Sequence, residues 1–353
     1  MSEAPVIIRI ENGVGRITLN RPKALHALTT EMCAAMLDAL ICWQTDDSVR
    51  AVLVDHADGT RGFCAGGDIR MVAESGRRDG IEAAEFFRIE YTLNNCIKHY
   101  QKPYIAIMDG VTMGGGVGIS VHGSHRITTD RTIFAMPETG IGLFPDVGGG
   151  WFLPRLAGEL GTWLALTGAQ LRGPDVVAAG IGTHFMPSDS IEEIKRAIID
   201  GEGIDAVLER LSSPVPMASF APHLDAINRC FAGNTISDIS IALNADGSEW
   251  ALKQANILTK RSPQSLAVSL RQLREGRRMT SFEEVMKMEY RLACRITSTK
   301  DFSEGVRAVI EEKDNAPKWH PCFDAFAMAD WSGLADLIAP MFDHLGKQEL
   351  HLP

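Results

Sequence analysis

The sequence predicts an α/β fold with a mainly helical C-terminal region. Short apolar strands alternate with glycine-rich turns and helical patterns through the first half of the chain. This alternation is typical of buried strands that are covered by helices. From about residue 190 onward, most segments are charged and have helical spacing. We therefore expect a core domain over 1–190 and a helical region over 191–353.

The first half contains most of the strand signals. The Asn12-Gly13 pair between two alternating apolar runs predicts a hairpin, and Thr29 or Thr30 is a candidate cap for the first helix. The expected elements are, in order, paired strands within 5–19, a helix over 29–44, a strand over 51–55, a helix over 82–100, and strands over 104–108 and 126–129.

Composition bounds the class of protein. The 353 residues are 45% apolar and 23% charged, which is ordinary for a soluble globular chain. A net charge of −10 disfavours binding to nucleic acid, and no apolar run approaches the length of a membrane span. Seven cysteines lie between Cys33 and Cys322 without a CxxC pair, and the first residues lack the pattern of a signal peptide. We expect a cytoplasmic protein.

Two glycine-rich turns each follow a predicted strand, over 62–70 and 109–118. Turns without Cβ atoms let a ligand approach backbone N–H groups, which attract negative charge at a helix start. Two such turns could direct two donors at one oxygen, as the chemistry of thioesters requires. The alternative is that the glycines only permit tight turns and close packing.

The carboxylates Glu138 and Asp146 stand in an apolar stretch rich in proline and glycine. Burial there would raise their pKa values and suit general acid or base catalysis. Alternatively, Glu138 caps a helix and Asp146 stabilises a turn. Glu90 lies in a helical pattern, where an exposed carboxylate is the ordinary interpretation.

The sequence gives no sign of a metal or cofactor. His122 and His125 have a metal-like spacing but no third ligand in a recognisable pattern. Neither glycine turn fits the dinucleotide or P-loop motifs. We expect no resident cofactor and no metal site.

Four ordered segments together resemble the crotonase (enoyl-CoA hydratase/isomerase) superfamily: Asn20-Arg-Pro-Lys-Ala-Leu-His-Ala-Leu, Phe63-Cys-Ala-Gly-Gly-Asp-Ile, Gly114-Gly-Gly-Val-Gly and Met136-Pro-Glu. The resemblance implies a spiral of β-β-α turns and an acyl-CoA substrate. It also implies an oxyanion hole formed by the N–H groups of Gly67 and Gly115. The adenine end of CoA would lie near Ala24, Leu25, Ala65, Gly66, Asp68 and Ile69.

A closer resemblance is to the 3-hydroxyisobutyryl-CoA hydrolase branch. It rests on four further stretches, which begin Phe86-Phe-Arg-Ile-Glu, Pro137-Glu-Thr-Gly-Ile-Gly, Met288-Glu-Tyr-Arg-Leu and Asp301-Phe-Ser-Glu-Gly. Carried over by position, Glu138 and Asp146 match the catalytic carboxylates, and Glu90 and Gly115 match positions that contact substrate. The implied reaction is hydrolysis of a short branched 3-hydroxyacyl-CoA, in valine degradation.

The sequence departs from the wider superfamily at two positions. Hydratases carry a second catalytic glutamate where this chain has Gly118, and His26 stands where many relatives have asparagine. The first difference disfavours hydration of an enoyl-CoA, while isomerisation and non-catalytic binding of acyl-CoA stay as alternatives. The superfamily often forms trimers, so a homo-oligomer is a further expectation.

Overall fold

The computed structural model describes residues 4–320 and 332–353. Its contacts divide the chain into two units whose segments alternate along the sequence. Unit 1 comprises 1–67, 92–135 and 170–219, and unit 2 comprises 68–91, 136–169 and 220–353. The α/β class predicted from the sequence is confirmed, while the boundary at residue 190 stays a prediction.

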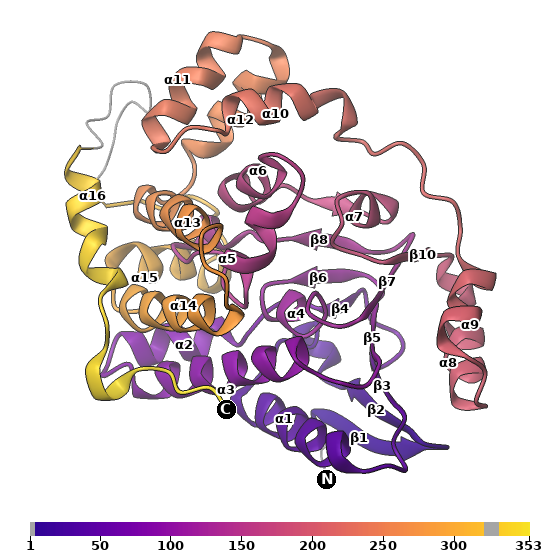
Figure 1. Cartoon of the computed structure of the whole chain (residues 1–353). Coiled ribbons are helices and arrows are strands. Elements are labelled where there is room, and N and C mark those ends of the chain that lie inside the picture. The colour runs from indigo at the N-terminus through magenta and orange to yellow at the C-terminus, as the bar shows by residue number, and fades with distance from the viewer. Residues whose placement is uncertain (1–3, 321–331) are drawn as a thin grey trace. The chain divides into compact units, whose positions relative to one another are not determined.

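Unit 1 contains a six-stranded sheet with the order β1-β2-β3-β5-β7-β10 (Figure 1). The strands β1 and β2 form the expected antiparallel hairpin, in which Asn12 and Gly13 both have positive φ. Every later pairing in this sheet is parallel. The strands are β1 (Val6–Glu11), β2 (Val14–Leu19), β3 (Ala51–His56), β5 (Tyr104–Met108), β7 (His125–Thr129) and β10 (His184–Met186).

Apolar side chains of this sheet pack against two helices, α8 (Ile191–Ile199) and α9 (Ile204–Leu211). Burial of such a face is the main source of stability for parallel strands. The buried cluster consists of Val14, Ala51, Leu53, Ile105, Ile107, Ile127, Met186, Ile191, Ile194, Ala197, Ile198, Val207 and Leu208. The helix expected over 29–44 is α1 (Thr30–Thr45), and the Thr29 hydroxyl accepts the N–H of Met32.

A second, four-stranded sheet of unit 1 carries both glycine turns. Its order is β4-β6-β8-β9, and the helix α4 (Gly115–Gly118) follows β6 directly. A Cβ on Gly116 would lie 2.2 Å from the carbonyl oxygen of Cys64, so only glycine fits there. The remaining elements of the unit are β4 (Gly62–Cys64), β6 (Val111–Met113), β8 (Ile133–Ala135), β9 (Leu171–Arg172) and α7 (Pro174–Ala178).

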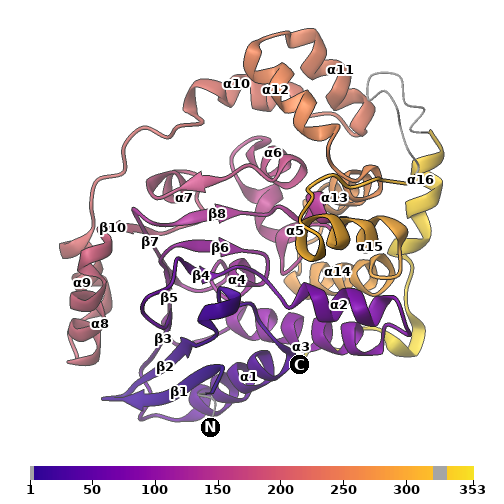
Figure 2. The same ribbon diagram turned by 180° about the vertical axis from the view of Figure 1, so that it is seen from behind.

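Unit 2 is built of helices, and Figures 1 and 2 show α13 and α14 beside the short helix α5. A Cβ on Gly276 would lie 2.0 Å from the carbonyl oxygen of Gly150, so the end of α13 contacts the backbone of α5. The helices are α2 (Ile69–Gly76), α5 (Gly149–Phe152), α6 (Leu160–Thr167), α10 (Leu224–Cys230), α11 (Ile236–Asp246), α12 (Glu249–Leu258), α13 (Pro263–Gly276), α14 (Phe282–Ile296), α15 (Lys300–Val306) and α16 (Ser332–Ile338).

One helix, α3 (Ile81–Lys98), has residues in both units, because the division falls after Tyr91. It matches the helical pattern expected over 82–100. Six cysteines in the range 4–320 are free thiols, and Cys322 lies outside the described residues. None of the helices in the described part of the chain has both the length and the hydropathy of a transmembrane span.

Candidate active site

In unit 1, the structure places the two glycine turns on neighbouring strands. The strand before Gly67, β4, pairs in parallel with β6, which precedes Gly115. Gly67 bridges to Leu28, and Gly115 is the first residue of α4. Among the described residues, no hydrogen bond uses the N–H of Gly67 or Gly115. Both donors are therefore available to an oxygen, as an oxyanion hole requires.

Four of the positions predicted to lie near the adenine end of CoA, Ala24, Leu25, Ala65 and Gly66, belong to two loops of unit 1 that are hydrogen-bonded to each other. Ala24 ends a 3₁₀ turn, and Leu25 follows it in a left-handed conformation. The N–H of Ala65 donates to the carbonyl oxygen of Leu25 at 3.0 Å. The N–H of Leu28 donates to the carbonyl oxygen of Gly66 at 2.8 Å. The structure therefore brings these predicted positions together.

Asp68 and Ile69 begin α2 and belong to unit 2. The Asp68 carboxylate accepts the N–H of Met71 and so caps this helix. His26 is fully buried, its Nδ1 accepts the N–H of Arg21, and burial lowers its pKa to about 4. A neutral histidine at this position shapes the loop through its hydrogen bonds, as expected for that departure from the superfamily pattern.

In unit 2, the three predicted carboxylates are all buried, with relative exposures of 2% for Glu90 and 4% for both Glu138 and Asp146. Glu90 lies on α3, Glu138 begins the 3₁₀ helix Glu138–Ile141, and Asp146 lies in the loop before α5. The alternative that Glu90 is a surface carboxylate is therefore wrong. Glu138 is also no cap, because Pro137 occupies that position and no side chain caps the turn.

Two of these carboxylates leave an oxygen without a partner. Within the described residues, Glu90 Oε1 and Glu138 Oε2 are buried and accept no hydrogen bond. A buried polar atom of this kind costs free energy, and structures retain it mainly where a ligand or a reacting group will meet it. Both atoms are therefore candidate contacts for a substrate.

The carboxylates also interact electrostatically. Burial raises the pKa of Glu138 well above its usual range, and the charge of Asp146 raises it further. Burial and Asp146 act in the same way on the pKa of Glu90. Burial raises the pKa of Asp146 itself only to about 6, because Tyr91 donates a hydrogen bond to it. Carboxyl groups whose pKa values are shifted by burial and by one another are suited to acid–base chemistry.

Three residues of this cluster were not singled out by the sequence analysis. The Tyr91 hydroxyl donates to Asp146 Oδ2 at 2.8 Å. Glu289 on α14 is fully buried and accepts backbone N–H groups from the turn that follows Asp146. Gln272 on α13 donates to Glu289 and to the carbonyl oxygen of Pro145. In the sequence, Glu289 lies at helical spacing from Val285 and Leu292, so a carboxylate on the apolar side of α14 is the signal that could have indicated it.

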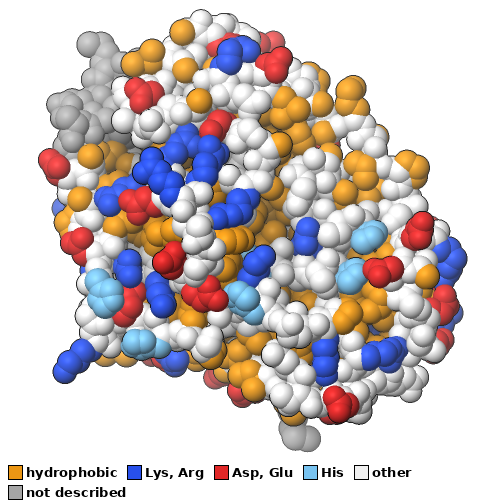
Figure 3. Space-filling view, in the orientation of Figure 1, with side chains coloured by type: hydrophobic (Ala, Val, Ile, Leu, Met, Phe, Trp, Pro, Cys, Tyr) orange, Lys and Arg blue, Asp and Glu red, His pale blue; other side chains and the backbone are white. Residues whose placement is uncertain are grey.

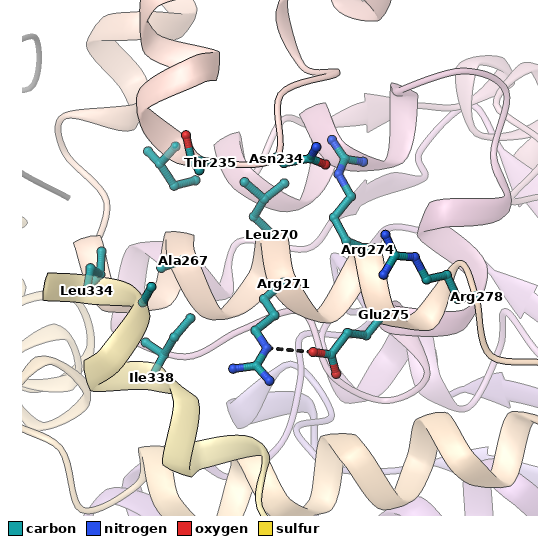
Figure 4. Close-up of a pocket in the computed structure, with 12 residues that line it drawn as sticks. Asn234, Thr235, Ala267, Leu270, Arg271, Arg274, Glu275, Arg278, Leu334 and Ile338 are labelled. Carbon is teal, nitrogen blue, oxygen red and sulfur yellow. Dashed lines mark hydrogen bonds and ion pairs between the residues drawn. The ribbon is translucent and has the colours of Figure 1, made fainter. Parts of the chain in front are cut away.

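Unit 2 also contains a cavity of about 450 Å³ beside α13 and α16, where basic side chains gather on the surface (Figures 3 and 4). None of the predicted site residues lines it. Its wall includes Arg271, which bonds Glu275, and Arg274, which bonds Glu159 and two backbone carbonyls. These charges are largely neutralised within the protein, whereas the carboxylate cluster has unsatisfied oxygens. The cluster is therefore the candidate active site.

Comparison with known proteins shows the family of the chain. The family model for enoyl-CoA hydratase/isomerase matches residues 14–325. The chain belongs to this family, within the crotonase superfamily. It is 49% identical to the mitochondrial 3-hydroxyisobutyryl-CoA hydrolase of Danio rerio, over 87% of this chain and 82% of the relative. Identity to the Homo sapiens protein of the same name is 47%, over 90% of this chain and 84% of the relative.

Two solved structures of family members share this fold. A carnitinyl-CoA dehydratase from Mycobacterium thermoresistibile is 41% identical, with a TM-score of 0.91 over 98% of both chains. An enoyl-CoA hydratase from Rhodobacter sphaeroides 2.4.1 is 35% identical, with a TM-score of 0.89 over 99% of this chain and 100% of that one. The crotonase fold expected from the four sequence segments is therefore confirmed.

Proposed function

We propose that this family member hydrolyses the thioester of 3-hydroxyisobutyryl-CoA, releasing 3-hydroxyisobutyrate and CoA. The observation that carries the proposal is the buried pair Glu138 and Asp146, which are electrostatically coupled while Glu138 Oε2 has no partner among the described residues. Relatives at 46–49% identity that carry this enzyme's name give independent support. The hydrolysis belongs to the degradation of valine.

The reaction adds water to the thioester carbonyl and breaks the carbon–sulfur bond. The oxygen of water ends in the acid, and the departing thiolate takes up a proton. Negative charge develops on the carbonyl oxygen, so we assign the N–H groups of Gly67 and Gly115 to that oxygen. Loss of one such preorganised donor typically costs about 3–4 kcal/mol of transition-state stabilisation.

Glu138 and Asp146 supply the nucleophilic and proton-transfer steps in this proposal. Burial raises the pKa of Glu138 and the charge of Asp146 raises it further, so ionisation of one carboxyl group disfavours ionisation of the other. Attack through Glu138 requires its ionised form, so the remaining proton then lies on Asp146, which provides it to the thiolate. Glu138 either attacks the carbonyl and forms a mixed anhydride, or it removes a proton from the attacking water. Hydroxylamine trapping distinguishes these routes, because only the anhydride yields a hydroxamate on Glu138.

Glu90 is assigned to the substrate's 3-hydroxyl group. Its Oε1 is buried and has no partner among the described residues, and burial raises the pKa of its carboxyl group. A site built to hydrogen-bond a hydroxyl discriminates strongly against an analogue without it, because the buried polar atom is then left unsatisfied. Glu90 therefore supplies specificity for a 3-hydroxyacyl chain.

A second candidate function is hydration of an enoyl-CoA, since both similar solved structures are named as a hydratase or dehydratase. In this chain, position 118 is occupied by glycine and lies inside α4, which is fully buried. The second glutamate expected of a hydratase is therefore missing. This difference favours hydrolysis over hydration.

The test is release of free thiol from (S)-3-hydroxyisobutyryl-CoA by the wild type and by Glu138→Gln. We expect rapid release by the wild type and a loss of at least 10³-fold in kcat for the variant, about 4 kcal/mol of activation free energy. The matched control is Glu82→Gln, because Glu82 is an exposed carboxylate on α3 that pairs with Arg78. Consumption of the double bond of crotonyl-CoA without thiol release would contradict the proposal.

The compartment and the oligomeric state of the protein stay proposals. Free thiols at the six described cysteines fit the reducing cytoplasm that the sequence predicts. The printed names of the animal relatives place those proteins in mitochondria. A homo-oligomer is expected from the superfamily, and sedimentation of the full chain measures it.

A further inference from the structure

The turn that follows Asp146 has an unfavourable backbone conformation. Val147 has a φ of +51°, in the left-handed region that β-branched residues rarely adopt, and Gly148 has a φ of +87°. A residue held there costs on the order of 1–3 kcal/mol and persists only where surrounding contacts support it. The position of the Asp146 carboxylate therefore depends on whatever holds this turn.

Glu289 supplies that support from 139 and 141 residues further along the chain. Its Oε2 accepts the N–H of Gly148 at 2.7 Å, and its Oε1 accepts the N–H of Gly150 at 2.8 Å. Gln272 donates to the same Oε1 at 3.0 Å and to the carbonyl oxygen of Pro145 at 2.7 Å. The residues on both sides of Asp146 are thus fixed by one buried carboxyl group and one amide.

The surrounding packing leaves little room for Glu289 to move. It is fully buried, and a Cβ on Gly150 would lie 3.1 Å from its Oε1. Its neighbour Tyr290 packs edge-on against Tyr91, with ring centroids 6.5 Å apart. Tyr91 in turn donates to Asp146. The unit 2 part of α3 therefore meets α13 and α14 at this turn.

Burial raises the pKa of Glu289 to about 8, while the N–H groups of Gly148 and Gly150 act to lower it. Asp146 acts in the same direction as burial. A carboxyl group that serves only to fill space would be replaced by an apolar residue at no such cost. Retention of a buried acid here indicates that its two acceptor oxygens are used.

We propose that Glu289 is a positioning residue for the reaction, holding the Asp146–Gly150 turn through its two backbone hydrogen bonds. The inference rests on the proposed function, because the role it gives to Glu289 is exercised through Asp146. Glu289 itself need not touch the substrate. Its removal should therefore affect the rate of the chemical step more than the binding of acyl-CoA.

The first measurement compares Glu289→Gln with the wild type in hydrolysis of (S)-3-hydroxyisobutyryl-CoA. The glutamine keeps the volume but replaces one acceptor oxygen by a donor that faces an N–H group. We expect kcat to fall about 10- to 100-fold, the size of effect that a displacement near 1 Å produces, with KM changed less than 3-fold. Glu284→Gln is the matched control, because Glu284 is exposed on the same helix.

A double-mutant cycle separates positioning from a general structural role. In an Asp146→Asn background, Glu289→Gln should cost less than 3-fold further in kcat, because the group that it positions is already neutral. Multiplicative losses in the double variant would overturn the proposal. So would an unchanged kcat in the single variant.

Hydrogen exchange tests the support without reference to activity. The amides of Gly148 and Gly150 should exchange at least 10-fold faster in Glu289→Gln than in the wild type, while those of α14 keep their protection. If the amides of Gly148 and Gly150 exchange faster in the variant but the wild type hydrolyses no 3-hydroxyacyl-CoA, the proposed function is wrong. The structural role of Glu289 in holding the turn is then still supported. Unchanged exchange of these amides would refute the support directly.

A second variant covers the case in which Glu289→Gln fails to fold. Gln272→Met keeps the size of the side chain but removes its bonds to Pro145 and Glu289. We expect a smaller loss in kcat, about 3- to 10-fold, with KM again retained. Full activity in this variant would contradict the idea that the turn needs support from both sides.

Discussion

Removal of a single hydroxyl group, in Tyr91→Phe, tests the protonation of the candidate site. The Tyr91 hydroxyl donates to Asp146 Oδ2 at 2.8 Å and thereby lowers the pKa of Asp146, which burial raises to about 6. The aromatic ring, which packs against Phe87 and Tyr290, is retained in the variant. The change is therefore confined to one hydrogen bond.

The magnitude follows from the strength of that bond. A hydrogen bond to a charged group contributes roughly 1.5–3 kcal/mol, and one pKa unit corresponds to about 1.4 kcal/mol. Its loss should raise the pKa of Asp146 by about 1–2 units. Because the bond favours the ionised carboxylate, the variant needs a higher pH to reach the same fraction of ionised Asp146.

The assay is kcat/KM for thiol release between pH 5 and pH 9. The acidic limb of the profile should move from about pH 6 in the wild type to about pH 7–8 in Tyr91→Phe, with the two curves converging near pH 9. Tyr290→Phe is the control, since this neighbouring tyrosine contacts the ring of Tyr91 without bonding Asp146. Coinciding acidic limbs for the wild type and Tyr91→Phe would refute the assignment of that limb to Asp146.

Three further changes test the site and its scaffold. Asp146→Asn should stabilise the fold at pH 8 by up to about 3 kcal/mol but should give no gain at pH 4. Burial raises the pKa of Asp146 from 3.8 to about 6, so ionisation of this carboxyl group opposes folding as the pH rises through that range. Thermal unfolding at both pH values measures this, and an equal gain at both would contradict it. Glu90→Gln should reduce the preference for 3-hydroxyisobutyryl-CoA over isobutyryl-CoA at least 10-fold in kcat/KM. The control Glu82→Gln should keep this preference. An unchanged preference in Glu90→Gln would show that Glu90 does not determine substrate specificity. Gly116→Ala should abolish soluble folded protein or lower its melting temperature by several degrees, because its Cβ would lie 2.2 Å from the carbonyl oxygen of Cys64. A melting temperature equal to that of the wild type would show that the fold does not require the close contact between the two glycine turns at Gly116 and Cys64.

Several elements of the six-stranded sheet of unit 1 could be predicted from local patterns, whereas the four-stranded sheet was not among the expected elements. The hairpin at Asn12-Gly13, the buried runs of β3 and β5 and the Thr29 cap are determined by residues close together in the sequence. The division into two alternating units could not be predicted in this way, because it depends on which distant segments pack together. The spacing of apolar residues indicates which face of one helix or strand is buried, but not which other element packs against that face.

The candidate site shows the same limit. Glu138 and Asp146 stood out because carboxylates are unusual among prolines and glycines, and Glu90 gained its assignment only from the family resemblance. Tyr91 carries no such local sign, and Glu289 is marked only by its place on the apolar side of its helix. Their roles arise from contacts across 55 and about 140 residues, respectively. Only the folded chain reveals which distant groups such residues contact.

The long separation between Glu289 and the turn that it holds has a consequence for synthesis of the protein. A ribosome has translated the Asp146–Gly150 segment long before α14 leaves the exit tunnel. Until then, the turn that contains the left-handed backbone of Val147 lacks the hydrogen bonds that the N–H groups of Gly148 and Gly150 donate to Glu289. A nascent or prematurely terminated chain therefore carries every carboxylate of the predicted catalytic set without the means to hold Asp146 in place. We therefore expect catalytic activity only after α13 and α14 have been synthesised, and none in incompletely synthesised chains.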